Sequence, residues 1–156
     1  MNSSKTLFDS AMGGDRRALA KLLTIAEEGG STGSYDKKPS WVLGITGPPG
    51  AGKSTLIDRL ASNWSEKGES IAILAVDPSS PVSGGALLGD RARMVFSDPS
   101  KIYFRSVSSR GSSGGISNGV RRMVEVLQSL GWDRILIETV GAGQGEFAIA
   151  SVADRV

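Results

Sequence analysis

A glycine-rich segment, Gly47–Ser54, constrains the fold of this chain more than any other feature of the sequence. Its residues read Gly-Pro-Pro-Gly-Ala-Gly-Lys-Ser, which matches the Gly-x-x-x-x-Gly-Lys-Ser pattern of a phosphate-binding P-loop. The apolar run Trp41–Thr46 precedes this segment, and a helical pattern, Thr55–Ala61, follows it. A P-loop joins a strand to a helix, and both flanks are present. The segment therefore predicts a strand–loop–helix unit of an α/β fold.

The chemistry of a P-loop assigns roles to these residues. Its glycines let the backbone curl so that successive N–H groups point at phosphate oxygens, and the following helix adds the positive end of its dipole. Lys53 is expected to reach the β- and γ-phosphates, and the hydroxyl of Ser54 to bind Mg²⁺. The predicted nucleotide contacts are Gly47, Pro48, Pro49, Gly50, Ala51, Gly52, Lys53, Ser54 and Thr55. The alternative, a glycine-rich turn with a chance lysine, leaves the flanking strand and helix unexplained.

Strand and helix patterns alternate after the P-loop. Three further apolar runs, Ser70–Val76, Ile102–Val107 and Arg134–Glu138, predict strands. A helix that Gly131 ends is predicted between the last two strands. The apolar face of this helix comprises Ile116, Val120, Met123, Val124, Leu127 and Leu130. Alternating units of this length predict an α/β fold with a mostly parallel sheet between helices, the three-layer fold of P-loop NTPases.

A short helical segment is predicted ahead of this domain. Asp15 is a candidate cap, and an apolar stripe follows it at helical spacing until Gly29 and Gly30 end the pattern. The stripe contains Leu19, Leu22, Leu23 and Ala26. Residues 1–12 are weakly patterned, and residues 29–40 are small, polar and proline-punctuated, as in a linker. The expected organisation is a helical arm and linker over residues 1–40, followed by the nucleotide-binding domain over residues 41–156.

Composition narrows the class of protein. The chain has 156 residues, of which 39% are hydrophobic and 22% charged, as in a soluble globular domain with a core. A net charge of +2 gives no support for a nucleic acid or membrane partner. The absence of cysteine and histidine excludes disulfides, thiolate zinc sites and a histidine general base. No apolar run reaches membrane-spanning length and no signal-peptide pattern is present, so we expect residence in the cytoplasm.

A segment rich in polar residues and glycine follows each predicted strand. In a parallel sheet these segments share the rim that carries the P-loop. Glu138 ends the last strand in the position of a Walker-B acid, which binds Mg²⁺ directly or through water. Gly141 follows at the spacing of a switch whose N–H meets the γ-phosphate. The alternative for Glu138 is a solvated carboxylate at a strand end, but the nearby P-loop favours the metal role.

Two more acids, Asp77 and Asp90, are expected at or near this rim. Mg²⁺ bound to phosphates needs only one or two carboxylates and a hydroxyl, so these two residues and Glu138 together exceed the need. Asp77 also suits a turn-forming Asp-Pro pair, and Asp90 a surface ion pair with Arg91 or Arg93. From spacing alone, both interpretations stay open for each acid.

Four segments of the chain resemble the methylmalonyl-CoA mutase-associated GTPases of the MeaB/ArgK family. They are GITGPPGAGKSTLIDRLA (44–61), AILAVDPSSPVSGGALLGDRARM (72–94), FRSVSSRGSSGG (104–115) and ILIETVGAGQGE (135–146). The resemblance runs from about Gly13 to Val156, and its most specific part is the region from Val76 to Arg91. Ser112 and Val82 depart from the histidine and phenylalanine that the family usually has there, and neither position touches the phosphate-binding pattern.

The resemblance implies a GTPase of the signal-recognition/MinD/BioD type that uses GTP, GDP and Mg²⁺. It implies a chaperone for a cobalamin-dependent acyl-CoA mutase, methylmalonyl-CoA mutase, which gates cofactor loading and protects the mutase from inactivation. The magnesium-site and switch acids of the family fall on Asp77, Asp90 and Glu138. Gln144 lies in the switch region, three residues beyond Gly141, so the water-positioning role of the glutamine in Ras-like proteins is not carried over. Lys53, Glu138 and Gln144 are the catalytic candidates.

The resemblance also creates expectations about the end of the chain. The family continues with further strands, an Asn-Lys-x-Asp motif that reads the base, and a dimerisation segment. The 156 residues contain no Asn-Lys-x-Asp, so the choice between guanine and adenine stays open. Val152–Val156 reads as the start of another strand, and we expect a truncated chain with an unpaired sheet edge. The family forms homodimers, whereas the segment for dimerisation is missing from this sequence.

Three classes of function remain at this point. A GTP-hydrolysing chaperone of a mutase is favoured. An ATPase or kinase of small-molecule or transport-associated metabolism is the alternative within enzymes, and an inactive fragment is the third class. For the first class, the segments Pro81–Arg93 and Arg110–Gly115 are expected to act as nucleotide-sensitive switches that contact the mutase, since their glycines permit more than one backbone conformation.

Overall fold

A parallel sheet forms the centre of the computed structural model, which describes residues 3–77, 98–108, 115–139 and 149–156. In chain order its strands are β1 (Trp41–Ile45), β2 (Ile71–Asp77), β3 (Ile102–Ser108) and β4 (Arg134–Thr139). In space they lie in the order β1-β4-β2-β3, and each pair of neighbouring strands is parallel. The carboxyl ends of all four strands therefore meet at one rim, as expected from the sequence.

The strand order sets which residues share that rim. β4 lies between β1 and β2, so Glu138 is in register with Ile45 on one side and Ala75 on the other. The apolar runs of the two inner strands, β2 and β4, are buried on both faces, and residues 71–76 of β2 are each no more than 1% exposed, whereas the edge strands β1 and β3 are only partly buried. Such runs are typical of strands covered by helices on both sides.

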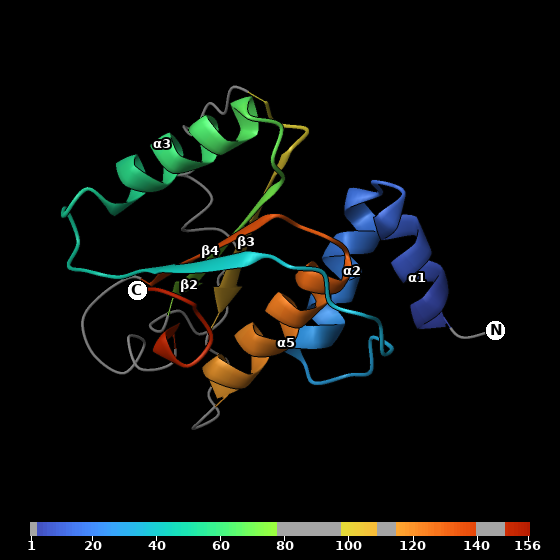
Figure 1. Ribbon diagram of the computed structural model, residues 1–156. Coiled ribbons are helices and arrows are strands. Elements are labelled where there is room, and N and C mark those ends of the chain that lie inside the picture. Colours follow the sequence, from blue (N-terminus) through green and yellow to red (C-terminus); the bar gives the residue numbers. More distant parts are fainter. Residues whose placement is uncertain (1–2, 78–97, 109–114, 140–148) are drawn as a thin grey trace.

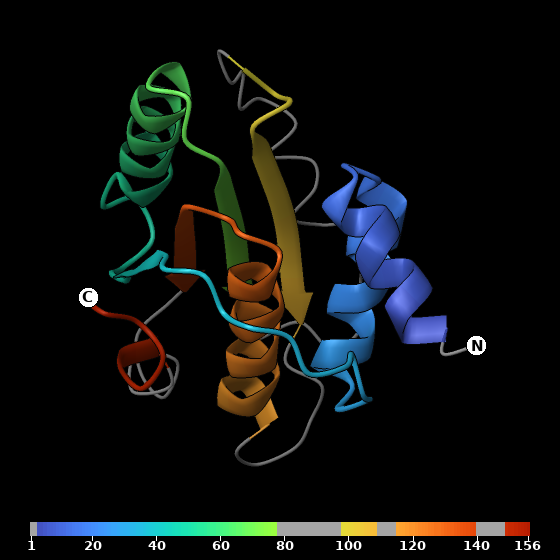
Figure 2. The ribbon, with the colours of Figure 1, turned by 45° about the vertical axis from the view of Figure 1, so that its right-hand side comes forward.

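Helices cover both faces of the sheet, which confirms the predicted α/β fold (Figures 1 and 2). One face is covered by α3 (Lys53–Glu66), whose Ile57 and Ala61 pack on Ile73 and Leu136. The other face is covered by α2 (Arg16–Glu27) and α5 (Gly115–Ser129), with α1 (Ser3–Met12) packed outside α2 (Figure 2). None of the helices in the described part of the chain has both the length and the apolar character needed to cross a bilayer.

Local signals in the sequence explain the boundaries of α2. The Asp15 carboxylate caps the helix by accepting hydrogen bonds from the N–H groups of Arg17 at 2.8 Å and Ala18 at 3.2 Å. The helix ends where Gly29 adopts a φ of 85°, which is rare for residues with a side chain. The predicted cap, apolar stripe and glycine stop are thus confirmed.

The helix α1 was not predicted from the sequence. Its apolar stripe is narrow, since Phe8 is the only buried residue of the helix and only Leu7 and Ala11 pack beside it as partly buried residues. Phe8 is held by Tyr35 from the linker, with the ring centroids 3.5 Å apart. This contact joins segments that are distant in sequence, so no local pattern shows it.

Arginines fasten the helical arm to the sheet and to α5. On β3, Arg105 forms a half-buried ion pair with Glu27 at 2.8 Å and donates to the Ala20 carbonyl oxygen at 3.0 Å. On α5, Arg122 donates through Nε to the Ala26 carbonyl oxygen at 2.6 Å. Ala26 lies in the last turn of α2, where a helical carbonyl has no i+4 partner within the helix, whereas Ala20 lies in its interior. The domain boundary at residue 40 stays a prediction.

Residues 149–156 cover the outer edge of β1. The Gly44 N–H donates to the Arg155 carbonyl oxygen at 2.7 Å, and the Asp154 N–H donates to the Val42 carbonyl oxygen at 2.8 Å. The Asp154 carboxylate accepts from the Val42 N–H at 2.8 Å. Leu43 and Arg155 form a parallel bridge, so strand-like pairing occurs within the segment where the sequence predicted a further strand.

We predict that Gly44→Ala destabilises the fold by displacing residues 149–156 from β1. A Cβ at Gly44 would lie 2.4 Å from Ile149 Cγ2 and 3.0 Å from Val156 Cγ2, closer than packed atoms tolerate. Overpacking of this kind costs about 1–3 kcal/mol. For a chain of this size the melting temperature in a calorimetric scan should fall by roughly 3–10 °C.

Gly13→Ala is the matched control, because a Cβ there meets only backbone oxygens at 3.4 and 3.6 Å. Equal melting temperatures for the two variants would mean that residues 149–156 do not pack closely against β1 at Gly44.

Candidate phosphate-binding site

The P-loop, Gly47–Ser54, begins two residues after the end of β1 and ends at the second residue of α3. Three of its glycines have positive φ angles, namely Gly47 at 147°, Gly50 at 80° and Gly52 at 88°. Residues with a Cβ rarely adopt such angles, so the glycines at these positions allow the loop its shape. The predicted strand–loop–helix unit is therefore present.

The N-terminus of α3 is open to an anion. Gly52 occupies the cap position without a side-chain hydrogen bond, so no cap side chain competes for the N–H groups of the first turn. Pro48, Pro49, Gly50, Ala51, Gly52, Ser54 and Thr55 are exposed. Exposed N–H groups and the positive end of the helix dipole together favour a bound phosphate.

Lys53 folds back over the loop in the structure. Its ammonium donates to the Gly47 carbonyl oxygen at 2.7 Å and to the Pro48 carbonyl oxygen at 2.9 Å. The positive charge is thereby held over the start of the loop rather than extended into solvent. Phosphate oxygens bound at the loop would compete with these carbonyls for the ammonium, as expected for a P-loop lysine.

Glu138 lies at the same rim, one strand away from the P-loop. It is 2% exposed and in register with Ile45, two residues before Gly47. Side chains alternate along a strand, so Glu138 shares the face of Leu136, which is the face covered by α3. The fold thus brings Glu138 toward the helix that begins with Lys53 and Ser54, as the sequence predicted.

A hydroxyl pair at this rim was missed in the sequence. Thr139 follows Glu138 and is 1% exposed, and its Oγ1 donates to Oγ1 of Thr46 at 3.0 Å. Thr46 is the last residue before Gly47. The only signal in the sequence was a threonine at the end of each of two apolar runs, and the pairing of those runs could not be known in advance.

The candidate metal ligands are only partly within the described residues. Ser54 and Glu138 are described, the backbone of Asp77 ends β2, and Asp90, Gly141 and Gln144 lie outside the described residues. The part of the chain that the structure describes holds no cluster of three or more acidic, histidine or cysteine residues suited to a metal. Hydroxyl and carboxylate oxygens are nevertheless the donors that Mg²⁺ takes beside phosphates, so Ser54 and Glu138 fit a magnesium ion.

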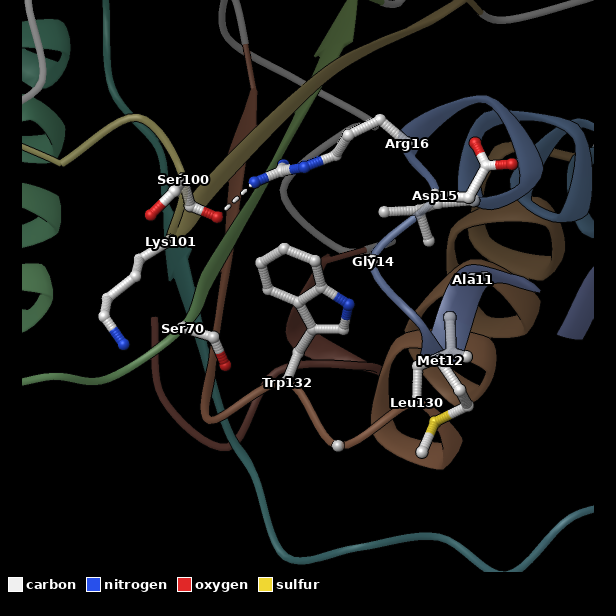
Figure 3. Close-up of a pocket in the computed structure, with 12 residues that line it drawn as sticks. Ala11, Met12, Gly14, Asp15, Arg16, Ser70, Ser100, Lys101, Leu130 and Trp132 are labelled. Atoms are coloured by element: carbon white, nitrogen blue, oxygen red, sulfur yellow. Dashed lines mark hydrogen bonds between the residues drawn. The ribbon is translucent and has the colours of Figure 1, made fainter. Parts of the chain in front are cut away.

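A separate hollow of about 370 Å³ lies at the opposite rim, beside the amino ends of β2, β3 and β4 (Figure 3). Trp132 lies at its centre, and the Cζ atom of Arg16 is 5.7 Å from the centroid of the Trp132 ring. Arg16 donates to the Ile102 carbonyl oxygen at 3.0 Å, and Lys101 donates to that of Gly68 at 3.1 Å. Both cations are thus engaged within the chain, and the hollow is the junction between the helical arm and the sheet.

The turn before β3 belongs to the same junction. The Asp98 carboxylate accepts hydrogen bonds from the hydroxyl and the N–H of Ser100, and the hydroxyl bond chiefly lowers the pKa of Asp98. The Ser100 carbonyl oxygen accepts from Arg16 (Figure 3). These contacts order the turn and are remote from the P-loop.

The chain is similar in sequence to one protein family and in structure to a solved protein. The profile of a family described as "Methylmalonyl Co-A mutase-associated GTPase MeaB" matches residues 11–156. A solved structure described as a LAO/AO transport system kinase superposes with a TM-score of 0.70 at 27% identity, over 99% of this chain and 49% of that one. Its similarity agrees with the P-loop α/β fold.

Individual relatives are similar over almost the whole chain. A Pyrococcus horikoshii protein provisionally named a GTPase is 44% identical over 159 residues, which cover 96% of this chain and 50% of that protein. The Mus musculus protein named "Methylmalonic aciduria type A homolog, mitochondrial" is 45% identical over 173 residues, which cover 95% of this chain and 41% of that protein. The chain spans about half the length of the curated relatives it matches.

We predict that Lys53→Ala lowers affinity for a magnesium–nucleoside triphosphate without unfolding the chain. The half-buried side chain belongs to neither core cluster and hydrogen-bonds to backbone oxygens of the loop, so its loss opens no cavity in the core. A charge-assisted hydrogen bond is worth about 1.5–3 kcal/mol, and the dissociation constant from titration calorimetry should rise tenfold or more.

Lys67→Ala serves as the control, because Lys67 is exposed at the other end of α3. Circular dichroism should be the same for the wild-type chain and both variants. If Lys53→Ala binds as tightly as the control, the loop does not use its lysine for phosphate.

Proposed function

The chain belongs to the MeaB family of methylmalonyl-CoA mutase-associated GTPases, and from this premise we propose that it binds GTP and GDP and hydrolyses GTP. The observation that carries the proposal is the P-loop, with its positive-φ glycines, its uncapped helix N-terminus and Lys53 above the loop. Phosphate binding is the chemistry that this arrangement supports best.

We assign the following roles within the site. Backbone N–H groups of the loop and Lys53 bind the phosphates, and Ser54 holds Mg²⁺ together with Glu138. Bound Mg²⁺ neutralises charge on the transferred phosphoryl group. Asp77 and Asp90 complete the proposed metal and switch acids. Gly141 is proposed to meet the γ-phosphate, and Gln144 to take part in the same switch region.

The proposed partner is a cobalamin-dependent methylmalonyl-CoA mutase, for which the chain acts as a chaperone in cofactor loading and protection. The family description and the name of the mouse relative support this link. We propose that Pro81–Arg93 and Arg110–Gly115, which lie largely outside the described residues, change conformation with the nucleotide and contact the mutase. A partner that prefers one nucleotide state must change nucleotide affinity by the same factor in return. Cytoplasmic residence and the homodimer of the family are further proposals.

A kinase or transport-associated ATPase is the second candidate, favoured by the description of the LAO/AO structure. The sequence contains no Asn-Lys-x-Asp, so the base must be identified by experiment. Phosphate release from GTP and from ATP should be compared, each with Mg²⁺ and with and without the mutase. Release from GTP that the mutase alters supports the proposal, whereas exclusive use of ATP, or phosphate transfer to a small acceptor, supports the second candidate.

We predict that Glu138→Gln slows hydrolysis far more than it weakens nucleotide binding. The substitution keeps the shape of a side chain that is 2% exposed and removes the charge that supports the metal. Loss of such a group typically costs about 10–100-fold in activity or metal affinity. Turnover should be measured over a range of Mg²⁺ concentrations, with nucleotide affinity from calorimetry.

Glu125→Gln is a matched control, because Glu125 pairs with Lys37 on the surface of α5. Turnover of Glu138→Gln equal to wild type at saturating Mg²⁺ would assign Glu138 a structural role instead.

A further inference from the structure

Two threonine hydroxyls meet where the P-loop leaves the sheet. We propose that Thr139 is a positioning residue, whose bond to Thr46 fixes the end of β4, and with it Glu138, relative to the P-loop. The inference rests on the hydrolytic function proposed above. It adds to that function a residue that contacts neither the phosphates nor the metal.

The register of the strands shows why this bond matters. The backbone pairing of β1 with β4 reaches Ile45 opposite Glu138. At the next position the two strands are joined by side chains, through the 3.0 Å bond from Thr139 Oγ1 to Thr46 Oγ1. Gly47 follows Thr46 with a φ of 147°, so the backbone of β1 turns away into the loop at this point. The hydroxyl bond therefore extends the contact between the strands to the start of the loop.

Because Thr139 is buried, loss of its hydrogen bond to Thr46 is costly. Its side chain is 1% exposed, and a buried hydroxyl that loses its partner cannot be compensated by water. Successive side chains of a strand point to opposite faces, so Thr139 holds β4 from the α5 face while Glu138 points to the α3 face. A shift of Thr139 therefore moves the neighbouring carboxylate relative to Lys53 and Ser54.

A kinetic signature follows from this arrangement. Phosphate binding depends on the loop backbone and Lys53, which are contiguous in the chain and need no contact with β4. Hydrolysis depends in addition on the placement of Glu138, and displacements of about 1 Å near reacting groups are costly. Loss of the bond should lower kcat while nucleotide affinity changes little.

Isosteric variants isolate the bond. Thr139→Val removes the hydroxyl and keeps the shape, Thr139→Ser restores the hydroxyl, and Thr46→Val removes the acceptor. Thr46→Val/Thr139→Val completes a double-mutant cycle. Ser65→Ala is the matched control, since Ser65 is 3% exposed and donates to the Ser62 carbonyl oxygen at 2.9 Å in the last turns of α3.

The first readout is enzymatic: kcat for GTP hydrolysis is measured together with nucleotide affinity. The second is amide hydrogen exchange of residues 46–53 in the nucleotide-free chain. For Thr139→Val we expect kcat to fall about threefold to tenfold, nucleotide affinity to stay within about twofold, and loop exchange to quicken by about threefold or more. For Thr139→Ser, kcat and loop exchange should stay within about twofold of wild type. The kcat of the double variant should equal that of either single variant, and should not be lowered by the product of the two single effects.

The inference is overturned if Thr139→Val and Ser65→Ala behave alike in both readouts, or if the two threonine substitutions act multiplicatively. It is also overturned if loop exchange does not change. Should the wild-type chain fail to hydrolyse GTP, the proposed function fails, and loop exchange alone decides whether Thr139 positions the P-loop.

Discussion

The parallel pairing of β1 with β4 is the contact on which the candidate site depends. β1 runs directly into the P-loop, and β4 carries Glu138 at the level of the last residue of β1. These two strands are distant in sequence, and only their pairing brings a carboxylate to the rim where the lysine and serine of the loop lie. The pairing is supported on the outer side of β1 by residues 149–156 and, at the rim, by the bond between Thr139 and Thr46.

The phosphate-binding loop could be predicted from the sequence because its shape is decided locally. Glycines at positions 47, 50 and 52 permit the positive φ angles, and the helix that starts at Lys53 follows in the same segment. The strands and the helices α2 and α5 were predicted for a similar reason, since buried strands and amphipathic helices leave characteristic periods in the chain. Their predicted ends agree with the structure to within one or two residues.

Features that depend on contacts between distant segments could not be predicted. All four strands read as apolar runs, so nothing in the sequence shows that β4 lies between β1 and β2. The helix α1 packs through a narrow stripe and an aromatic contact with Tyr35, and neither gives a helical period of useful length. The bonds from Lys53 to the loop carbonyls and the threonine pair likewise appear only in three dimensions. Asp90, Gly141 and Gln144 lie outside the described residues, and their roles stay predictions.

The most direct test of the account is a titration of the ¹⁵N-labelled chain with GDP and Mg²⁺, followed by amide chemical shifts, with ADP as a parallel ligand. We expect saturable shifts concentrated at residues 46–55 and at the end of β4, at lower concentrations of GDP than of ADP. Shifts that do not saturate, or that centre on the hollow around Trp132 at the opposite rim, would contradict it.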